Sequence, residues 1–197
     1  MTSSGPYALV AIGASWGGLD VLRNILRDLP AELNAAVVIA QHRSPGSHPT
    51  AMRDLLGAVT RLRVAEAGDK DELYPGTVYL AAPDYHLLIE PGVVTLSTDE
   101  PLHYARPSID VLLETAAESY RERCIGVVLT GANDDGALGL ARVAELGGTA
   151  IVQDPATAQR DEMPLAALRA TPAARITPVA EIAPLLIELC GLARVTV

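Results

Sequence analysis

The sequence predicts an α/β fold: a doubly wound, mainly parallel sheet flanked by helices on both faces, with a small β-hairpin-rich excursion in the middle. Two observations support this prediction. Apolar runs of strand length alternate with segments of helical period along most of the chain. These strands are also apolar throughout, as strands covered on both faces are. The 197 residues are enough for one such domain.

The first part of the chain predicts two strand–helix units. The run YALVAIGA (7–14) is a buried strand, and a helix with one apolar face follows it. The residues of that face are Leu22, Ile25, Leu26 and Leu29. The run AAVVIAQH (35–42) is a second buried strand, and HPTAMRDLLGAV (48–59) is expected to form the second helix.

The middle of the chain has a different pattern. Four short strands are expected there, at 61–67, 76–83, 85–91 and 93–99. The turn sequences YPG, PDY and PG separate them, and such turns favour hairpins.

Helical alternation then resumes. A long helix is expected over 106–123, with Ser108 as its N-cap. The remaining expected elements are a strand at 124–131, a helix at 135–148, a strand at 149–154 and helices at 163–171 and 179–191. We therefore expect one domain over 7–191, with short tails at 1–6 and 192–197.

Composition excludes several classes of protein. The net charge of −9 argues against nucleic-acid binding, which needs a basic face. Lys70 is the only lysine, so the chain has neither a Walker phosphate loop nor a plausible Schiff-base lysine. Cys124 and Cys190 are expected to be buried free thiols. No basic residue precedes the first apolar run and no run is of bilayer length, so we expect a cytoplasmic protein without membrane insertion.

Polar residues that follow the apolar strands form the candidate site, because ligands of open parallel sheets bind outside the carboxyl ends of the strands. These residues are Ser15, His42, Thr130, Asn133, Asp134, Asp135 and Asp154. A serine, a histidine and several aspartates at one sheet edge are what a Ser-His-Asp relay requires. The imidazole takes the proton of the serine hydroxyl, and the carboxylate orients the imidazole. Backbone N–H groups at the turn and the following helix dipole can stabilise an oxyanion.

Alternatives remain open at this point. The G-x-S-x-G pattern around Ser15 also resembles a degenerate dinucleotide-binding loop, although Gln41-His42 stands where that loop needs an acidic residue. In an α/β-hydrolase the aspartate precedes the histidine along the chain, whereas here His42 precedes the candidate aspartates. The histidines that compete with His42 are His48, His86 and His103. Asp134 competes with Asp135, which could instead cap the following helix.

Several spaced motifs, in order along nearly the whole chain, resemble the catalytic domain of the chemotaxis protein-glutamate methylesterase (CheB) family. These motifs are VAIGASWGG, QHRSPGSHP, EAGDKDELYPGTVYLAAPDYH, RPSID, GVVLTGANDDGALGL and IVQDPATAQRDEMPLAAL. The family fold is a doubly wound α/β sheet with a small β-rich excursion, so the resemblance implies the same architecture as the hydrophobic pattern.

The resemblance implies a hydrolase of γ-glutamyl methyl esters on chemoreceptor helices that releases methanol and can also deamidate glutamines. It makes Ser15 the nucleophile, His42 the general base and acid, and Asp135 the orienting carboxylate. The candidates for the oxyanion region and substrate groove are Trp16, Gly17, Ala132, Asn133 and Met163. The resemblance implies neither a cofactor nor a metal, and the sequence shows no metal-ligand spacing.

The chain departs from the family pattern at two positions and in its architecture. Trp16 stands where many members have threonine, and Ala132 where they have methionine. Both changes alter the groove but leave the backbone donors in place. Well-known members carry an amino-terminal phospho-receiver domain, whereas the first strand here is expected to begin near residue 7. Three forms of regulation are therefore open: a separate receiver protein acts in trans, the chain is one domain of a larger system, or the activity is unregulated. The alternative function is a non-catalytic signalling module that binds a receptor or regulator.

Overall fold

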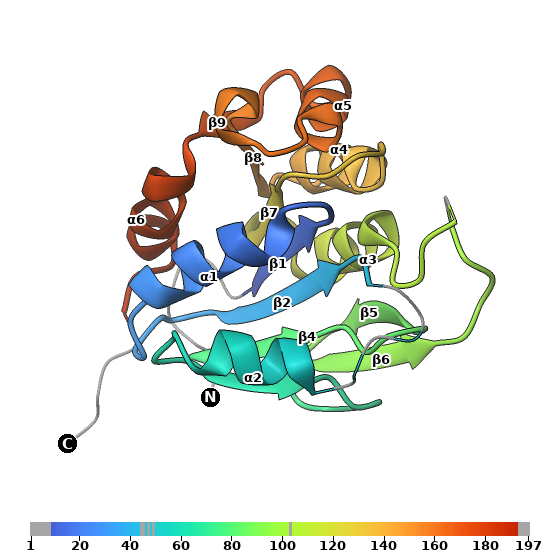
Figure 1. The fold of residues 1–197 in the computed structure, drawn as a ribbon, viewed down its shortest axis with the longest axis vertical. Coiled ribbons are helices and arrows are strands. Elements are labelled where there is room, and N and C mark those ends of the chain that lie inside the picture. Colours follow the sequence, from blue (N-terminus) through green and yellow to red (C-terminus); the bar gives the residue numbers. More distant parts are fainter. Residues whose placement is uncertain (1–8, 44–45, 47, 49, 103, 193–197) are drawn as a thin grey trace.

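A seven-stranded parallel sheet organises the chain in the computed structural model, which describes residues 9–43, 46, 48, 50–102 and 104–192. The strands lie in the order β3-β4-β2-β1-β7-β8-β9, and β5 and β6 form a separate antiparallel hairpin (Figure 1). The strands are β1 (Leu9–Ala14), β2 (Ala36–Gln41), β3 (Arg63–Glu66), β4 (Thr77–Leu80), β5 (His86–Glu90), β6 (Val93–Ser97), β7 (Cys124–Val128), β8 (Thr149–Gln153) and β9 (Arg175–Thr177).

Helices cover both faces of the sheet, which confirms the predicted doubly wound fold. They are α1 (Gly18–Asp28), α2 (Ala51–Gly57), α3 (Ile109–Tyr120), α4 (Ala137–Glu145), α5 (Glu162–Ala170) and α6 (Val179–Cys190). Side chains of α1, α2 and α6 share one buried cluster with the sheet, whereas α3, α4, α5 and the hairpin share the other. Figure 1 shows α1 and α6 on one side of β1 and β7, and α3 and α4 on the other.

The central strand β1 explains how the two cores form. All six of its residues are buried, and it pairs in parallel with β2 on one side and β7 on the other. Because side chains alternate along a strand, Val10 and Ile12 enter the core under α1, while Leu9 and Ala11 enter the core under α3. The apolar face expected for α1 is buried as predicted, with Leu22 and Leu26 at 0% exposure.

The middle of the chain only partly follows the expected hairpin pattern. The β5–β6 hairpin forms, but β3 and β4 pair in parallel within the main sheet. The segment between β3 and β4 bonds to the hairpin instead: Lys70 N–H donates to the carbonyl of Val94, and Val94 N–H to that of Asp71. The sequence analysis also missed β9, a three-residue edge strand with two exposed residues.

The structure describes little of the two chain ends, but it includes both cysteines. The expected tails, 1–6 and 192–197, lie outside the described residues except for Leu192, which forms an isolated bridge with Leu33. Cys124 and Cys190 are buried and free, as expected, and burial raises the pKa of each thiol to about 12. Among the described helices, none combines the length and apolar character that crossing a bilayer requires.

The contact between β1 and the start of α3 predicts a stability effect. A Cβ at Gly13 would overlap the Cγ2 atom of Ile109, a fully buried residue at the first position of α3. We expect Gly13→Ala to lower the free energy of unfolding by about 1–3 kcal/mol, because overpacking displaces α3. Gly57→Ala is the matched control, since a Cβ there comes no closer than 4.0 Å to Val64. Urea denaturation of both variants measures the effect, and equal stabilities would contradict it.

Candidate active site

Ser15, His42 and Asp135 lie in hydrogen-bonded series at the carboxyl edge of the sheet. The Nδ1 atom of His42 is 3.1 Å from the Oγ atom of Ser15, and its Nε2 atom is 2.7 Å from the Oδ2 atom of Asp135. The three residues follow β1, β2 and β7, which are adjacent in the sheet. Ser15 and His42 are 27 positions apart in the chain, and His42 and Asp135 are 93 apart, so the strand order and not nearness in the sequence brings these residues to one edge.

The turn between β1 and α1 presents Ser15. Its backbone N–H donates to the carbonyl of Thr130 at 3.0 Å, and its own carbonyl accepts from Gly18 at 2.9 Å. Gly17 between them has φ +78°, a left-handed conformation that favours glycine and lets the chain turn directly into α1. The serine therefore lies immediately before the amino-terminal end of a helix.

The loop after β2 holds His42 beside that turn. His42 N–H donates to the carbonyl of Ala14 at 3.0 Å, which ties the end of β2 to the end of β1. The side chain of Gln41 donates to the carbonyl of Ser15 at 2.8 Å and to that of His42 at 3.1 Å. Gln41 thus couples the turn that carries Ser15 to the histidine, a role that its place next to His42 in the sequence did not reveal.

Asp135 is fully buried and accepts hydrogen bonds from the start of α3. Its Oδ1 atom accepts from Ser108 Oγ and from Asp110 N–H, both at 2.9 Å, and its Oδ2 atom accepts from Ile109 N–H at 2.8 Å. Burial alone would raise the pKa of this carboxyl, but the hydrogen bonds from His42, Ile109 and Asp110 outweigh it and hold the pKa below its usual range. Asp135 is therefore an anion at neutral pH.

The ionised carboxylate decides which nitrogen of His42 carries the proton. Because Asp135 can only accept, the hydrogen of a neutral imidazole lies on Nε2, between the ring and Oδ2. The Nδ1 atom is then left with a lone pair directed at the Ser15 hydroxyl. This is the arrangement that a general base needs.

The interpretation of Asp135 as a cap for the helix that follows it is wrong. Gly136 occupies the N-cap of α4, and Asp135 caps α3 instead. Ser108, expected only as the N-cap of α3, does accept from Val111 N–H and also donates to Asp135. The sequence analysis did not predict this second role.

Two backbone donors beside Ser15 are suited to an oxyanion. Ser15 N–H is already bonded to Thr130, whereas the N–H groups of Trp16 and Gly17 have no acceptor within the described part of the chain. Both lie at the amino-terminal end of α1, where the helix dipole favours negative charge. The side chain of Trp16 is 65% exposed and is free to contact a substrate.

The other candidates of the oxyanion region differ in position. Ala132 is exposed and Asn133 is half-buried, and the Asn133 side chain accepts from Asp135 N–H at 3.3 Å. Met163 is only 1% exposed and donates its N–H to the carbonyl of Gly131 at 3.0 Å. A Cβ at Gly131 would overlap the Met163 sulfur and lie 2.8 Å from the Cβ of Ser15. Met163 therefore lies beneath the site.

The competing histidines and aspartates lie elsewhere or have other partners. His86 is buried: its Nδ1 atom accepts from Ser108 N–H at 3.2 Å and its Nε2 atom is 3.2 Å from the carbonyl of Glu100. Asp154 caps the short helix after β8, and Asp134 is exposed. His103 lies outside the described residues. No group of His, Cys, Asp and Glu that could hold a metal occurs among the residues searched, which are the described ones.

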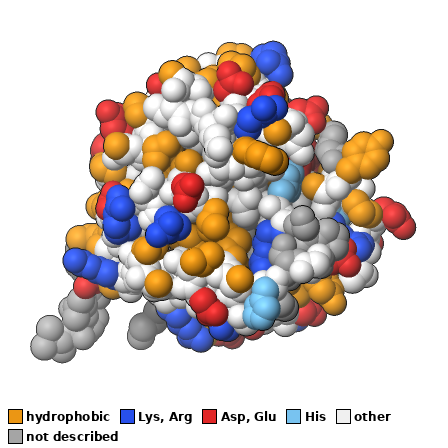
Figure 2. All heavy atoms as spheres, viewed as in Figure 1, with side chains coloured by type: hydrophobic (Ala, Val, Ile, Leu, Met, Phe, Trp, Pro, Cys, Tyr) orange, Lys and Arg blue, Asp and Glu red, His pale blue; other side chains and the backbone are white. Residues whose placement is uncertain are grey.

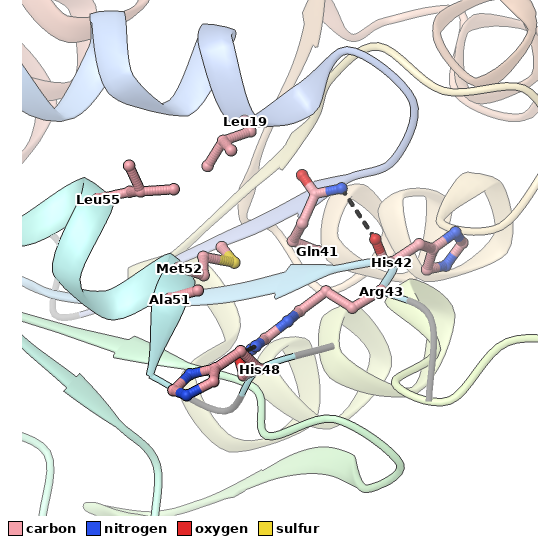
Figure 3. Close-up of a pocket in the computed structure, with 8 residues that line it drawn as sticks. All are labelled: Leu19, Gln41, His42, Arg43, His48, Ala51, Met52 and Leu55. Carbon is pink, nitrogen blue, oxygen red and sulfur yellow. Dashed lines mark hydrogen bonds between the residues drawn. The ribbon is translucent and has the colours of Figure 1, made fainter. Parts of the chain in front are cut away.

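An apolar pocket of about 340 Å³ adjoins the histidine. It is lined by Leu19, Gln41, His42, Arg43, His48, Ala51, Met52 and Leu55 (Figure 3). In Figure 3 the ring of His42 points away from Leu19 and Leu55, so the pocket lies behind the imidazole. Figure 2 shows hydrophobic side chains gathered over α1 and α2, where this pocket opens.

An α/β sheet with a serine, a histidine and a buried aspartate in series has the geometry of a serine hydrolase. The comparisons with known proteins agree with this class. The family model described as CheB methylesterase matches residues 10–186. The chain therefore belongs to the CheB methylesterase family, which confirms the resemblance drawn from its motifs.

Three similar proteins illustrate this membership. A putative protein-glutamate methylesterase/protein-glutamine glutaminase of Leptospira interrogans is 43% identical, over 93% of this chain and 95% of that protein. Protein-glutamate methylesterase FrzG of Myxococcus xanthus is 40% identical, but the chain spans only 55% of its length. The crystal structure of the Thermotoga maritima CheB methylesterase catalytic domain superposes with a TM-score of 0.88 at 35% identity, covering 93% of this chain and 98% of that one.

The lowered pKa of Asp135 predicts a pH-dependent contribution to stability. A carboxyl whose pKa is lower in the folded chain stabilises it above the unfolded pKa, about 4, and stops doing so as pH falls through the folded pKa. We expect Asp135→Asn to destabilise the protein by about 2 kcal/mol at pH 7, with the difference shrinking below about pH 4. Thermal melts of both proteins from pH 7 to pH 3 measure it. A difference that grows as the pH falls would contradict the assignment.

Proposed function

We propose that this protein is a protein-glutamate methylesterase that hydrolyses γ-glutamyl methyl esters on chemoreceptors, and that the same site deamidates receptor glutamines. The observation that supports it is the series Ser15 Oγ, His42 and Asp135, with distances of 3.1 and 2.7 Å, in a chain of the CheB methylesterase family. The names of the relatives from Leptospira and Myxococcus point to the same reaction.

In the first half of the reaction, the Oγ atom of Ser15 attacks the ester carbonyl while its proton passes to Nδ1 of His42. The imidazole becomes a cation, which Asp135 stabilises through the Nε2–H bond. The N–H groups of Trp16 and Gly17 face the oxyanion of the tetrahedral intermediate. When this intermediate collapses, Nδ1 returns the proton to the departing methoxide, so methanol leaves and the glutamyl group remains bonded to Ser15.

In the second half, a water molecule attacks the acyl-enzyme. His42 accepts a proton from the water, and a second tetrahedral intermediate forms at the same donors. Its collapse breaks the bond to Ser15, and His42 returns the proton to the serine oxygen. The products are a glutamate side chain and the free enzyme. With a glutamine substrate the leaving group is ammonia in place of methanol, and the remaining steps are the same.

We place the reaction in the cytoplasm, on the methylated helices of a chemoreceptor, with a separate phospho-receiver protein as the candidate regulator. Neither nucleic acid nor membrane insertion is part of this proposal. The net charge of −9 supports the first exclusion. The exposed Trp16 beside the nucleophile supports direct contact with a protein substrate.

A second candidate is a non-catalytic module of the same fold that binds a receptor or regulator. The exposed Trp16 and Ala132 favour it, because both change the surface next to Ser15. A fluorophosphonate probe distinguishes the two functions, since it bonds only to an activated hydroxyl. Labelling of Ser15 supports the esterase, and an unlabelled, folded protein supports the binding module. A dinucleotide loop is less well supported, because Gln41 is bonded to the nucleophile turn.

Removing the nucleophile tests the reaction. Ser15→Ala should lower methanol release from methylated receptor membranes at least about 1,000-fold, because no acyl-enzyme can form. Ser97→Ala, in the β6 hairpin strand, is the matched control and should retain wild-type turnover. Methanol release is measured for both variants beside their melting curves. Turnover by a folded Ser15→Ala protein at the wild-type rate would refute the assignment.

The role of His42 predicts the pH profile of the reaction. The base must be neutral to accept the serine proton, so kcat/KM should fall on the acid side in proportion to the fraction of protonated imidazole. The measurement is kcat/KM between pH 5 and 9 with a methylated receptor peptide. A flat profile over that range would remove His42 from the role of base.

A further inference from the structure

Two aspartates link the starts of α3 and α4. Each accepts hydrogen bonds from backbone N–H groups at the start of the helix beside the other aspartate. Asp135 precedes α4, yet its carboxylate accepts from Ile109 and Asp110, the first two N–H groups of α3. Asp110 belongs to α3, yet its Oδ1 atom accepts from Gly136 at 2.9 Å and Gly139 at 2.8 Å, at the start of α4. The two helices pack side by side, as Figure 1 shows.

The two helices approach so closely that the first turn of α4 has few alternatives. A Cβ at Gly139 would lie 2.7 Å from the Cβ of Leu113 and 2.8 Å from the carbonyl oxygen of Asp110, so only glycine fits there. Asp110 is 2% exposed, and Gly136 and Gly139 are buried with it. The N–H groups at the start of a buried helix need acceptors, and the Asp110 oxygen supplies one acceptor for two of them.

We propose that Asp110 is a positioning residue for the catalytic relay. By bonding the N–H groups of Gly136 and Gly139, it fixes the backbone that carries Asp135 and thereby the distance from Asp135 to His42. Without it the start of α4 loses this acceptor, and Asp135 is held through its own contacts to α3, His42 and Asn133. This inference rests on the proposed function, because it assigns Asp110 to the same relay.

The Oδ1 atom is the part of Asp110 that holds the start of α4. Burial raises the pKa of its carboxyl, the N–H of Gly139 opposes that effect, and the nearby Asp135 carboxylate adds to it. A single oxygen, Oδ1, accepts both bonds from α4. Asparagine offers an oxygen at the same place, so Asp110→Asn can keep both bonds whereas Asp110→Ala keeps neither.

The test measures the rate of fluorophosphonate labelling of Ser15, which reports on the relay without the natural substrate. We expect Asp110→Ala to slow labelling about 10-fold or more, since small misplacements of catalytic groups have effects of this size or larger. Asp110→Asn should label within about threefold of wild type, because the acceptor oxygen is restored. Val143→Ala, at a buried position near the carboxyl-terminal end of α4, controls for loss of packing and should also label at the wild-type rate.

The outcomes separate this inference from the proposed function. Wild-type protein that is not labelled would overturn the proposed function, and the inference with it. Labelled wild type with an equally fast Asp110→Ala variant would overturn the inference alone. If Asp110→Ala fails to fold, Asp110→Asn and Asp110→Glu decide. Glutamate retains the charge but moves the oxygen by one methylene. Slow labelling of Asp110→Glu together with fast labelling of Asp110→Asn supports the positioning role, and the reverse order overturns it.

Discussion

The buried carboxylate of Asp135 is the constraint on which the site depends. A charge with 0% exposure is stable only if its oxygens are hydrogen-bonded, and four donors converge on this one. Three of them come from the start of α3 and the fourth is His42, after β2. The requirement to keep this anion solvated by the protein therefore ties together segments that are distant in the chain.

The strand order makes this convergence possible. Because β1 lies between β2 and β7, the three loops that carry Ser15, His42 and Asp135 leave neighbouring strand ends. Short contacts then fix the loops to one another: His42 N–H to Ala14, Ser15 N–H to Thr130, and the side chain of Gln41 to the carbonyl of Ser15. The hydroxyl and the imidazole are thus positioned by backbone bonds and by Gln41, none of which depends on the identity of the side chains of Trp16 or Ala132.

Local patterns in the sequence predicted the features that depend on a single strand or helix. Ser15 and His42 were found because each directly follows an apolar strand, and α1 because its leucines recur at helical spacing. Asp134 and Asp135 could not be told apart from the residues alone, since neighbouring positions differ only in the direction of their side chains; the family resemblance selected Asp135. The interpretation of Asp135 as a cap for α4 relied on local sequence, in which α4 follows Asp135 directly. The true partners in α3 lie about 25 residues earlier in the chain, so no local pattern indicates them. The prediction of a hairpin between β3 and β4 failed for a similar reason. The turn sequence favours a hairpin, but the segment between the two strands bonds to β6, and β3 and β4 pair in parallel.

The protonation of His42 tests the central claim most directly. If Asp135 is the ionised partner of Nε2, the neutral imidazole carries its hydrogen on Nε2 and leaves Nδ1 as the base for Ser15. Nitrogen-15 NMR of labelled protein at neutral pH distinguishes the two ring nitrogens by their chemical shifts and proton couplings. The geometry predicts a protonated Nε2 and an unprotonated Nδ1. A neutral ring with its hydrogen on Nδ1 would contradict it, because the nitrogen facing the serine could not then accept a proton.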